Sequence, residues 1–98
     1  MLFMAEYGKH AKKPEVFKEA LQPHLDYLEA EKDRVLLSAT KYDTETNAVL
    51  GFVWIVEAAD REEAEAICQR DPFWTAGLRT SFHLCSLTKA NPDRSSLI

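Results

Sequence analysis

The residues best suited to chemistry in this chain are His24 and Asp71, which lie far apart in the sequence. Asp71 opens the segment Asp71–Gly77, which holds two large aromatic side chains. Burying each aromatic stabilises the fold by roughly 1.5–3 kcal/mol, so the segment is expected to pack against the protein and take Asp71 with it. A carboxylate bonded to one imidazole nitrogen fixes the tautomer and makes the other nitrogen more basic. We therefore predict that the two residues pair as a general acid/base site.

The pair also has a purely structural interpretation. His24 would then be a core histidine satisfied by a hydrogen bond, and Asp71 would cap or tether the chain. A polar side chain turned towards a core must find a partner or cost about 1–3 kcal/mol, so contact is expected in both cases. The sequence leaves both interpretations open.

Several neighbouring residues are candidates for substrate binding. Phe73 and Trp74 are placed to line an apolar pocket beside the pair, which would suit an aromatic or lactone-like ligand. The alternative is that they are core or dimer contacts. Arg79 and Lys41 are candidates for binding an anionic substrate group, and exposed strand charges are the alternative for them.

Metal and cofactor chemistry is not predicted. The three histidines show neither H-x-H nor HExxH spacing, so no metal site is expected. His83 and Cys85 are expected on one face of a strand, where same-face neighbours lie about 6–7 Å apart, too far for a direct bond. The three glycines are isolated, so no phosphate-binding loop is present, and we expect no cofactor.

Composition limits the classes of function. The 98 residues suffice for one domain with one core, and 46% are hydrophobic. Twelve basic and 16 acidic residues give a net charge of −4, which disfavours nucleic-acid and anionic-membrane binding. The two cysteines lack CxxC spacing, so no disulfide is expected. The first residues resemble neither a signal peptide nor a membrane span, and a cytoplasmic location is predicted.

The first half of the chain predicts a strand, a helix and a second strand. Residues 2–7 are apolar and read as a strand. Residues 15–32 carry apolar groups at helical spacing after Pro14, with His24 on the same face as the leucines, and Pro23 is expected to kink or split the helix. Residues 34–43 predict the second strand.

The second half predicts a hairpin, a helix, a loop and a last strand. Polar residues 43–47 form the hairpin turn, and residues 48–58, apolar on both faces, predict a central strand in which Gly51 marks a bulge or a close backbone approach. Asp60 and Glu63 have capping-box spacing for a helix to about residue 70, which Pro72 ends. A loop over residues 71–77 is followed by a strand over residues 78–88.

The element order β-α-β-β-α-β defines an α+β, ferredoxin-like fold with a four-stranded antiparallel sheet. Two helices cover one face only. The other face still carries apolar residues, either Phe52, Trp54 and Val56 or Val53 and Ile55, so we predict a two-fold homodimer packed sheet to sheet. A single domain is expected over residues 1–90, with a mobile polar tail at 91–98.

Over residues 2–89 the chain resembles the YciI-like (YCII-related) family of the dimeric ferredoxin-like α/β-barrel superfamily. The resemblance rests on Pro23–Leu28 in the first helix, on Asp71-Pro72-Phe73 ending in Ala76-Gly77, and on Asp60–Ala64 at the start of the second helix. It implies a homodimer and a His–Asp site formed by His24 and Asp71. Family members usually carry a Gly-Pro pair after the core of the second strand, and Ser38-Ala39-Thr40 stand there in this chain.

Most members of that family have no assigned reaction, and a few act as lyases or dehydrochlorinases on ring compounds. Our hypothesis is thus a small dimeric, cofactor-independent enzyme of the lyase, isomerase or dehydrochlorinase type, in which His24 and Asp71 act on a small organic molecule, with a cyclic one as one option. A non-catalytic dimer that binds a ligand or stabilises a partner is the alternative. A cofactor-independent monooxygenase is related by fold, but no residue favours it.

Overall fold

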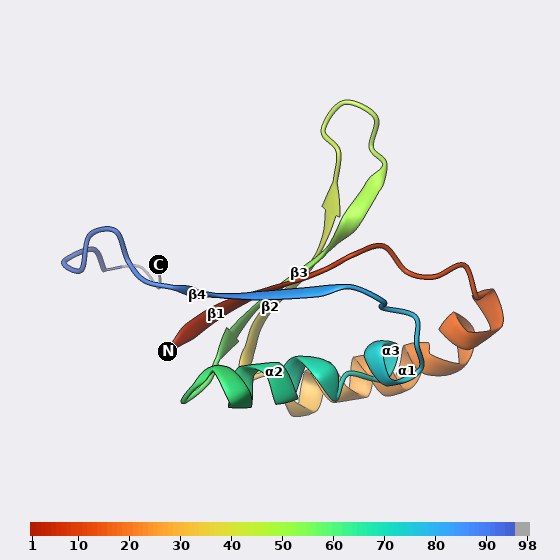
Figure 1. The fold of residues 1–98 in the computed structure, drawn as a ribbon, viewed down its shortest axis with the longest axis horizontal. Coiled ribbons are helices and arrows are strands. Elements are labelled where there is room, and N and C mark those ends of the chain that lie inside the picture. The colour runs from red at the N-terminus through yellow and green to blue at the C-terminus, as the bar shows by residue number, and fades with distance from the viewer. Residues whose placement is uncertain (96–98) are drawn as a thin grey trace.

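The computed structural model describes residues 1–95 and shows two layers, a sheet and a set of helices on one of its faces (Figure 1). The elements are β1 (Leu2–Tyr7), α1 (Pro14–Ala30), β2 (Val35–Tyr42), β3 (Val49–Glu57), α2 (Arg61–Gln69), α3 (Pro72–Thr75) and β4 (Phe82–Leu87). The strands pair antiparallel in the order β2-β3-β1-β4. The predicted ferredoxin-like fold is confirmed, with β1 and β3 at the centre of the sheet.

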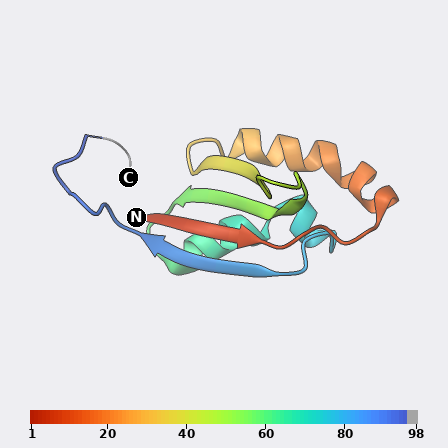
Figure 2. The same ribbon diagram turned by 90° about the horizontal axis from the view of Figure 1, so that it is seen from above.

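Strand alternation divides the sheet into a covered face and an open face. The covered face holds the main core, whose largest fully buried side chains include Tyr7, Trp54 and Ile67. Seen from above, α1 runs along the β2 side of this face and α2 lies across β1 and β4 (Figure 2). Of the two sets left open by the sequence, Val53 and Ile55 belong to the open face, because their neighbours in β3 are buried under the helices.

Helix α1 is continuous through Pro23, so of the two expected effects, a kink or a split, the split does not occur. Its apolar stripe is also less buried than predicted. His24 and Ala20 are buried, whereas Phe17, Leu21 and Leu25 are 39%, 37% and 47% exposed. These three side chains line a cavity rather than a closed core, as described below.

Helix α2 begins as its sequence predicts. Asp60 is the N-cap, and its carboxylate accepts a hydrogen bond of 2.8 Å from the amide of Glu63. The Glu63 side chain accepts from the amide of Ala59 at 3.3 Å, one residue before the position that a capping box uses. The helix ends at Gln69, close to the predicted boundary.

Two boundaries differ from the sequence prediction after α2. Residues 71–77 were expected to form a loop, but Pro72–Thr75 form the one-turn helix α3, capped by Asp71. Proline suits the first turn of a helix, where its missing N–H has no partner to lose. The last strand starts at Phe82 rather than Leu78, because Leu78 and Arg79 turn inward and are buried.

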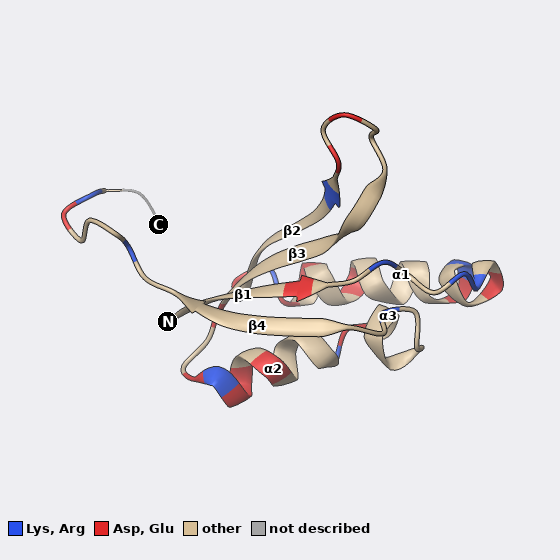
Figure 3. Ribbon diagram, turned by 45° about the horizontal axis from the view of Figure 1, so that its top comes forward, with Lys and Arg blue, Asp and Glu red and all other residues tan. Residues whose placement is uncertain are grey.

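The β2–β3 hairpin extends past the other strands, and its tip lies on the side away from the helices (Figure 1). Charged side chains gather at this tip, at the start of α1 and along α2, whereas β4 has none (Figure 3). Within residues 1–95, no helix is both long and apolar enough to cross a membrane. Residues 91–95 of the predicted tail are exposed, and 96–98 lie outside the described residues.

Candidate active site

His24 and Asp71 meet beneath the sheet. Nδ1 of His24 lies 2.6 Å from Oδ1 of Asp71, and the two side chains are 8% and 0% exposed. The same oxygen accepts the amide N–H of Phe73 at 3.3 Å, which is the cap of α3. An ionised carboxylate only accepts hydrogen bonds, so Nδ1 of His24 carries the shared proton. Nε2 of a neutral His24 is then a free acceptor.

Arg79 contacts the second oxygen of Asp71. Its Nη1 lies 3.1 Å from Oδ2, outside hydrogen-bond geometry, so the contact is an ion pair. The guanidinium also lies 4.2 Å from the ring centroid of Tyr7 and 4.9 Å from that of Phe52. Burial lowers the pKa of Arg79, and the charge of Asp71 opposes that effect. Aromatic faces and one carboxylate thus hold the cation inside the protein.

His10 joins this network from the other side. Nε of Arg79 donates to Nε2 of His10 at 3.4 Å, and the backbones of the two residues form an isolated antiparallel bridge. The His10 ring stacks on Phe52 at 4.3 Å and meets the edge of Phe73 at 5.0 Å. Burial lowers the pKa of His10, the charge of Arg79 adds to that effect, and the charge of Asp71 opposes it. The hydrogen bond from Arg79 and the lowered pKa both favour the neutral form of His10.

A cavity of about 250 Å³ lies between α1 and the β2–β3 hairpin and is lined by His10 and His24. Its other walls are Phe17, Leu21, Leu25, Ser38, Ala39, Thr40, Phe52, Phe73 and Arg79. Ser38–Thr40 of β2 thus form one wall. The cavity is mainly apolar and aromatic, with a few polar groups, which is the usual composition of a small-molecule site.

The predicted site residues are distributed unevenly around this cavity. Phe73 lines it and is 4% exposed, whereas Trp74 packs against Tyr7 and Phe82 and does not line it. Arg79 is 4% exposed, so the alternative of an exposed strand charge is wrong for it. Lys41 borders a separate depression next to the end of β1.

Sequence reasoning missed His10 as a site residue. It stands in a polar connector before α1, in a run that includes Lys9, Lys12 and Lys13, and nothing in that composition marks it as half-buried. Its position follows from the bridge to Arg79, a long-range contact. Phe52 and Phe73 stack on His10, but nothing in their local sequence indicates a contact with the connector before α1.

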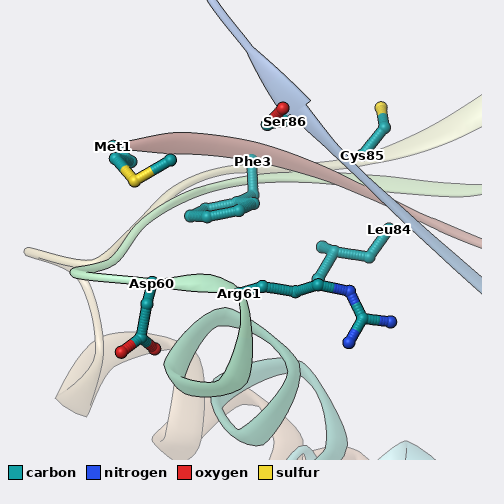
Figure 4. Close-up of a pocket in the computed structure, with 7 residues that line it drawn as sticks. All are labelled: Met1, Phe3, Asp60, Arg61, Leu84, Cys85 and Ser86. Atoms are coloured by element: carbon teal, nitrogen blue, oxygen red, sulfur yellow. The ribbon is translucent and has the colours of Figure 1, made fainter.

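A second cavity, of about 290 Å³, lies at the opposite end of the sheet, next to the start of α2 (Figure 4). Phe3 and Leu84 lie between the strands and the helix, whereas the thiol of Cys85 points away from them on the open face (Figure 4). Arg61 at its edge pairs with Glu65 at 3.4 Å. This cavity contains no buried acid–base pair, so it is a weaker candidate than the first.

The fold and the site together define an α+β protein with a buried histidine–carboxylate pair beside an aromatic cavity. The family model of the YCII-related domain matches residues 1–86. The chain belongs to the YCII-related domain family. Among curated protein sequences, none matches it significantly.

Two solved structures share the fold. One is the 5-chloro-2-hydroxyhydroquinone dehydrochlorinase TftG from Burkholderia phenoliruptrix AC1100, in complex with 2,5-dihydroxybenzoquinone, with a TM-score of 0.73 and 24% identity. That match covers 90% of this chain and 94% of the other. The other is an antibiotic biosynthesis monooxygenase, with a TM-score of 0.50 and 19% identity over 93% of this chain and all of the other. At these identities the likeness extends to the fold alone.

Proposed function

We propose that this protein is a small acid–base enzyme that moves a proton on a cyclic organic molecule bound in the 250 Å³ cavity. The observation that carries the proposal is the hydrogen bond of 2.6 Å between Asp71 and His24, which lines that cavity. Asp71 holds the proton of Nδ1, and Nε2 of His24 then serves as the base. Asp71 is the positioning residue, and His24 is the catalytic one.

The cavity supports a flat ligand. Phe17, Phe52 and Phe73 provide aromatic walls, and the fold is shared with a dehydrochlorinase solved in complex with a dihydroxybenzoquinone. Removal of a proton by His24, followed by its return to another atom or by loss of a leaving group, gives isomerase, lyase or dehydrochlorinase chemistry. None of these reactions requires a group beyond the side chains already named.

The test is exchange of ring hydrogens. 2,5-Dihydroxybenzoquinone is incubated in D2O with the wild-type protein, and loss of its ring C–H signal is followed by NMR. We expect the wild type to accelerate exchange and His24→Gln to lower the accelerated rate by about 10²–10⁴-fold. His83→Gln, the same change at an exposed histidine outside the cavity, should exchange like the wild type.

The alternative function is ligand binding without catalysis. In that case the quinone would bind, as judged by absorbance titration, but its ring hydrogens would exchange no faster than in buffer. Melting curves of a His24 variant distinguish a catalytic role of His24 from a structural one. If His24 serves only the fold, His24→Ala should lower the melting temperature markedly; if it serves catalysis, stability should change little.

We also propose that the protein is a homodimer that packs through its open sheet face. Leu2, Met4, Val53, Ile55 and Leu87 lie there, half-buried, with no helix over them. Ile55→Lys should convert the dimer into a folded monomer in analytical ultracentrifugation, because the interface would then bury an ammonium from each protomer. Thr44→Lys at the exposed hairpin tip is the control. A monomeric wild type at micromolar concentration would contradict this proposal.

A further inference from the structure

The Asp71–Arg79 ion pair anchors two histidines at one cavity in opposite ways. Asp71 is an acceptor, so it engages the protonated Nδ1 of His24. Arg79 is only a donor, so it engages the unprotonated Nε2 of His10 at 3.4 Å. The free nitrogen of His24 is therefore a bare acceptor, whereas the free nitrogen of His10, Nδ1, carries a hydrogen.

We propose that His10 is a second catalytic residue, whose Nδ1–H donates a hydrogen bond to a ring oxygen of the ligand while His24 takes the proton of the neighbouring ring carbon. This inference rests on the proposed function, because it assigns another group to the same cavity. It also narrows the substrate class to small rings in which a carbonyl stands next to a saturated C–H carbon, such as cyclic ketones and the keto tautomers of hydroxyquinones.

The step needs no reagent other than the ligand and the two histidines. The C–H bond at a saturated ring carbon next to the carbonyl breaks and its proton bonds to Nε2 of His24, while the electron pair of that bond forms a C=C double bond. In 2,5-dihydroxybenzoquinone that saturated carbon arises when the ring carbon gains a proton and the adjacent hydroxyl loses one, so the ring hydrogen exchanges with D2O through this keto tautomer. The π electrons of the adjacent carbonyl move to its oxygen, where the hydrogen bond from His10 meets the new negative charge. Return of the proton to a different carbon gives an isomer, and loss of a leaving group from the ring gives an elimination product.

The aromatic contacts place both imidazoles around one ring-sized space. His24 stacks on Phe73 at 3.9 Å, while His10 stacks on Phe52 and touches the edge of the same Phe73. A cavity on the order of 150 Å³ accepts benzene, so 250 Å³ suffices for one ring with several oxygens. Preorganised donors are most effective where water is partly excluded, and His10 is half-buried against Phe52 and Phe73.

The first experiment needs no ligand. In protein labelled with ¹⁵N at histidine, long-range ¹H–¹⁵N correlation at pH 7 reports which nitrogen of each ring is protonated. We expect His10 to be neutral with its proton on Nδ1. A His10 ring protonated on Nε2, or on both nitrogens, would overturn the inference whatever the variants below show.

The second experiment uses 2,5-dihydroxybenzoquinone with His10→Phe and His10→Gln. Phenylalanine keeps a ring against Phe52 but removes the donor, and glutamine restores a donor. We expect His10→Phe to weaken quinone binding about tenfold and slow ring exchange about 10²-fold, and His10→Gln to recover much of both. Lys9→Ala, an exposed change in the same connector, is the matched control and should behave like the wild type.

The pattern of losses separates the two proposals. If His24→Gln abolishes exchange while His10→Phe retains binding and exchange, the proposed function stands and the role of His10 is refuted. If His24→Gln retains exchange, or the wild type leaves the quinone unbound, the proposed function fails and this inference falls with it. His10→Gln that is as weak as His10→Phe also refutes the donor role.

Discussion

The imidazole of His24 lies flat on the phenyl ring of Phe73, with centroids 3.9 Å apart and planes 10° from parallel. The stack fixes the tilt of the imidazole, and the hydrogen bond to Asp71 fixes its rotation within the ring plane. Asp71 caps the single turn that carries Phe73. One turn of helix therefore supplies both constraints on the proposed base.

Phe73→Leu tests the stack. Leucine fills much of the same buried volume, so the free energy of unfolding should fall by only about 1–2 kcal/mol in urea titrations. The His24 ring loses its flat support, and quinone exchange should slow by about 10-fold or more, because catalysis is sensitive to misplacement of the base. A variant that loses stability but keeps the wild-type exchange rate would show that the stack serves packing alone.

The Asp71–Arg79 ion pair should be strongly cooperative. Arg79→Gln alone leaves a buried carboxylate without its counter-charge, and Asp71→Asn alone leaves a buried guanidinium, so each single change should cost about 3–5 kcal/mol. The double variant buries neutral amides instead. A double-mutant cycle from chemical denaturation should thus give a coupling of about 1–3 kcal/mol. Additive losses would mean that the contact contributes nothing to stability.

Much of the fold was accessible from the sequence because local patterns agree with the final packing. The apolar runs over residues 2–7 and 48–58, the Asp60 cap and the polar hairpin turn each predicted the element that the structure contains. His24 could be singled out because a histidine on an apolar helix face needs a buried partner. Asp71 was the partner that the aromatic segment after α2 would bring inward.

The features of the fold and site that the sequence did not predict depend on long-range contacts, which leave no local pattern in the sequence. Leu78 and Arg79 alternate like strand residues, but Arg79 is drawn out of β4 by the charge of Asp71 and by the ring of Tyr7. His10 looks like part of a solvated connector until its bridge to Arg79 is known. Trp74 was expected in the pocket with Phe73, yet successive residues of a helical turn point in different directions.

Gly51 is the glycine at which a side chain is least tolerable. Its φ is +148°, and an added Cβ would lie 2.4 Å from the carbonyl oxygen of Tyr7. Gly51→Ala should therefore lower the free energy of unfolding by about 2–4 kcal/mol, since backbone of both central strands must separate. Gly77→Ala is the control: it also has a positive φ, +78°, but its nearest contact is a lysine nitrogen at 4.0 Å, and about 1 kcal/mol is expected. Equal losses in thermal melts would argue against a close strand approach.

Tyr27 links stability to alkaline pH. Its hydroxyl donates to the carbonyl of Ile67 at 2.6 Å, and burial, assisted by the charge of Glu31, raises the pKa of Tyr27 to about 12 from the ordinary 10.0. Between these values the unfolded chain releases the phenolic proton and the folded chain keeps it, so stability falls as pH rises. The contribution is complete below pH 10 and lost as pH passes 12.

Tyr27→Phe isolates that contribution. It should cost about 1 kcal/mol at neutral pH, where the hydrogen bond is intact, and the loss should shrink between pH 10 and 12, because the variant has no proton to release. Tyr42→Phe, at a side chain that is 53% exposed, is the matched control and should follow the wild-type curve. The measurement is urea unfolding across that pH range. A wild type and a Tyr27→Phe variant that differ by the same amount at every pH would show that the phenol of Tyr27 does not titrate with unfolding.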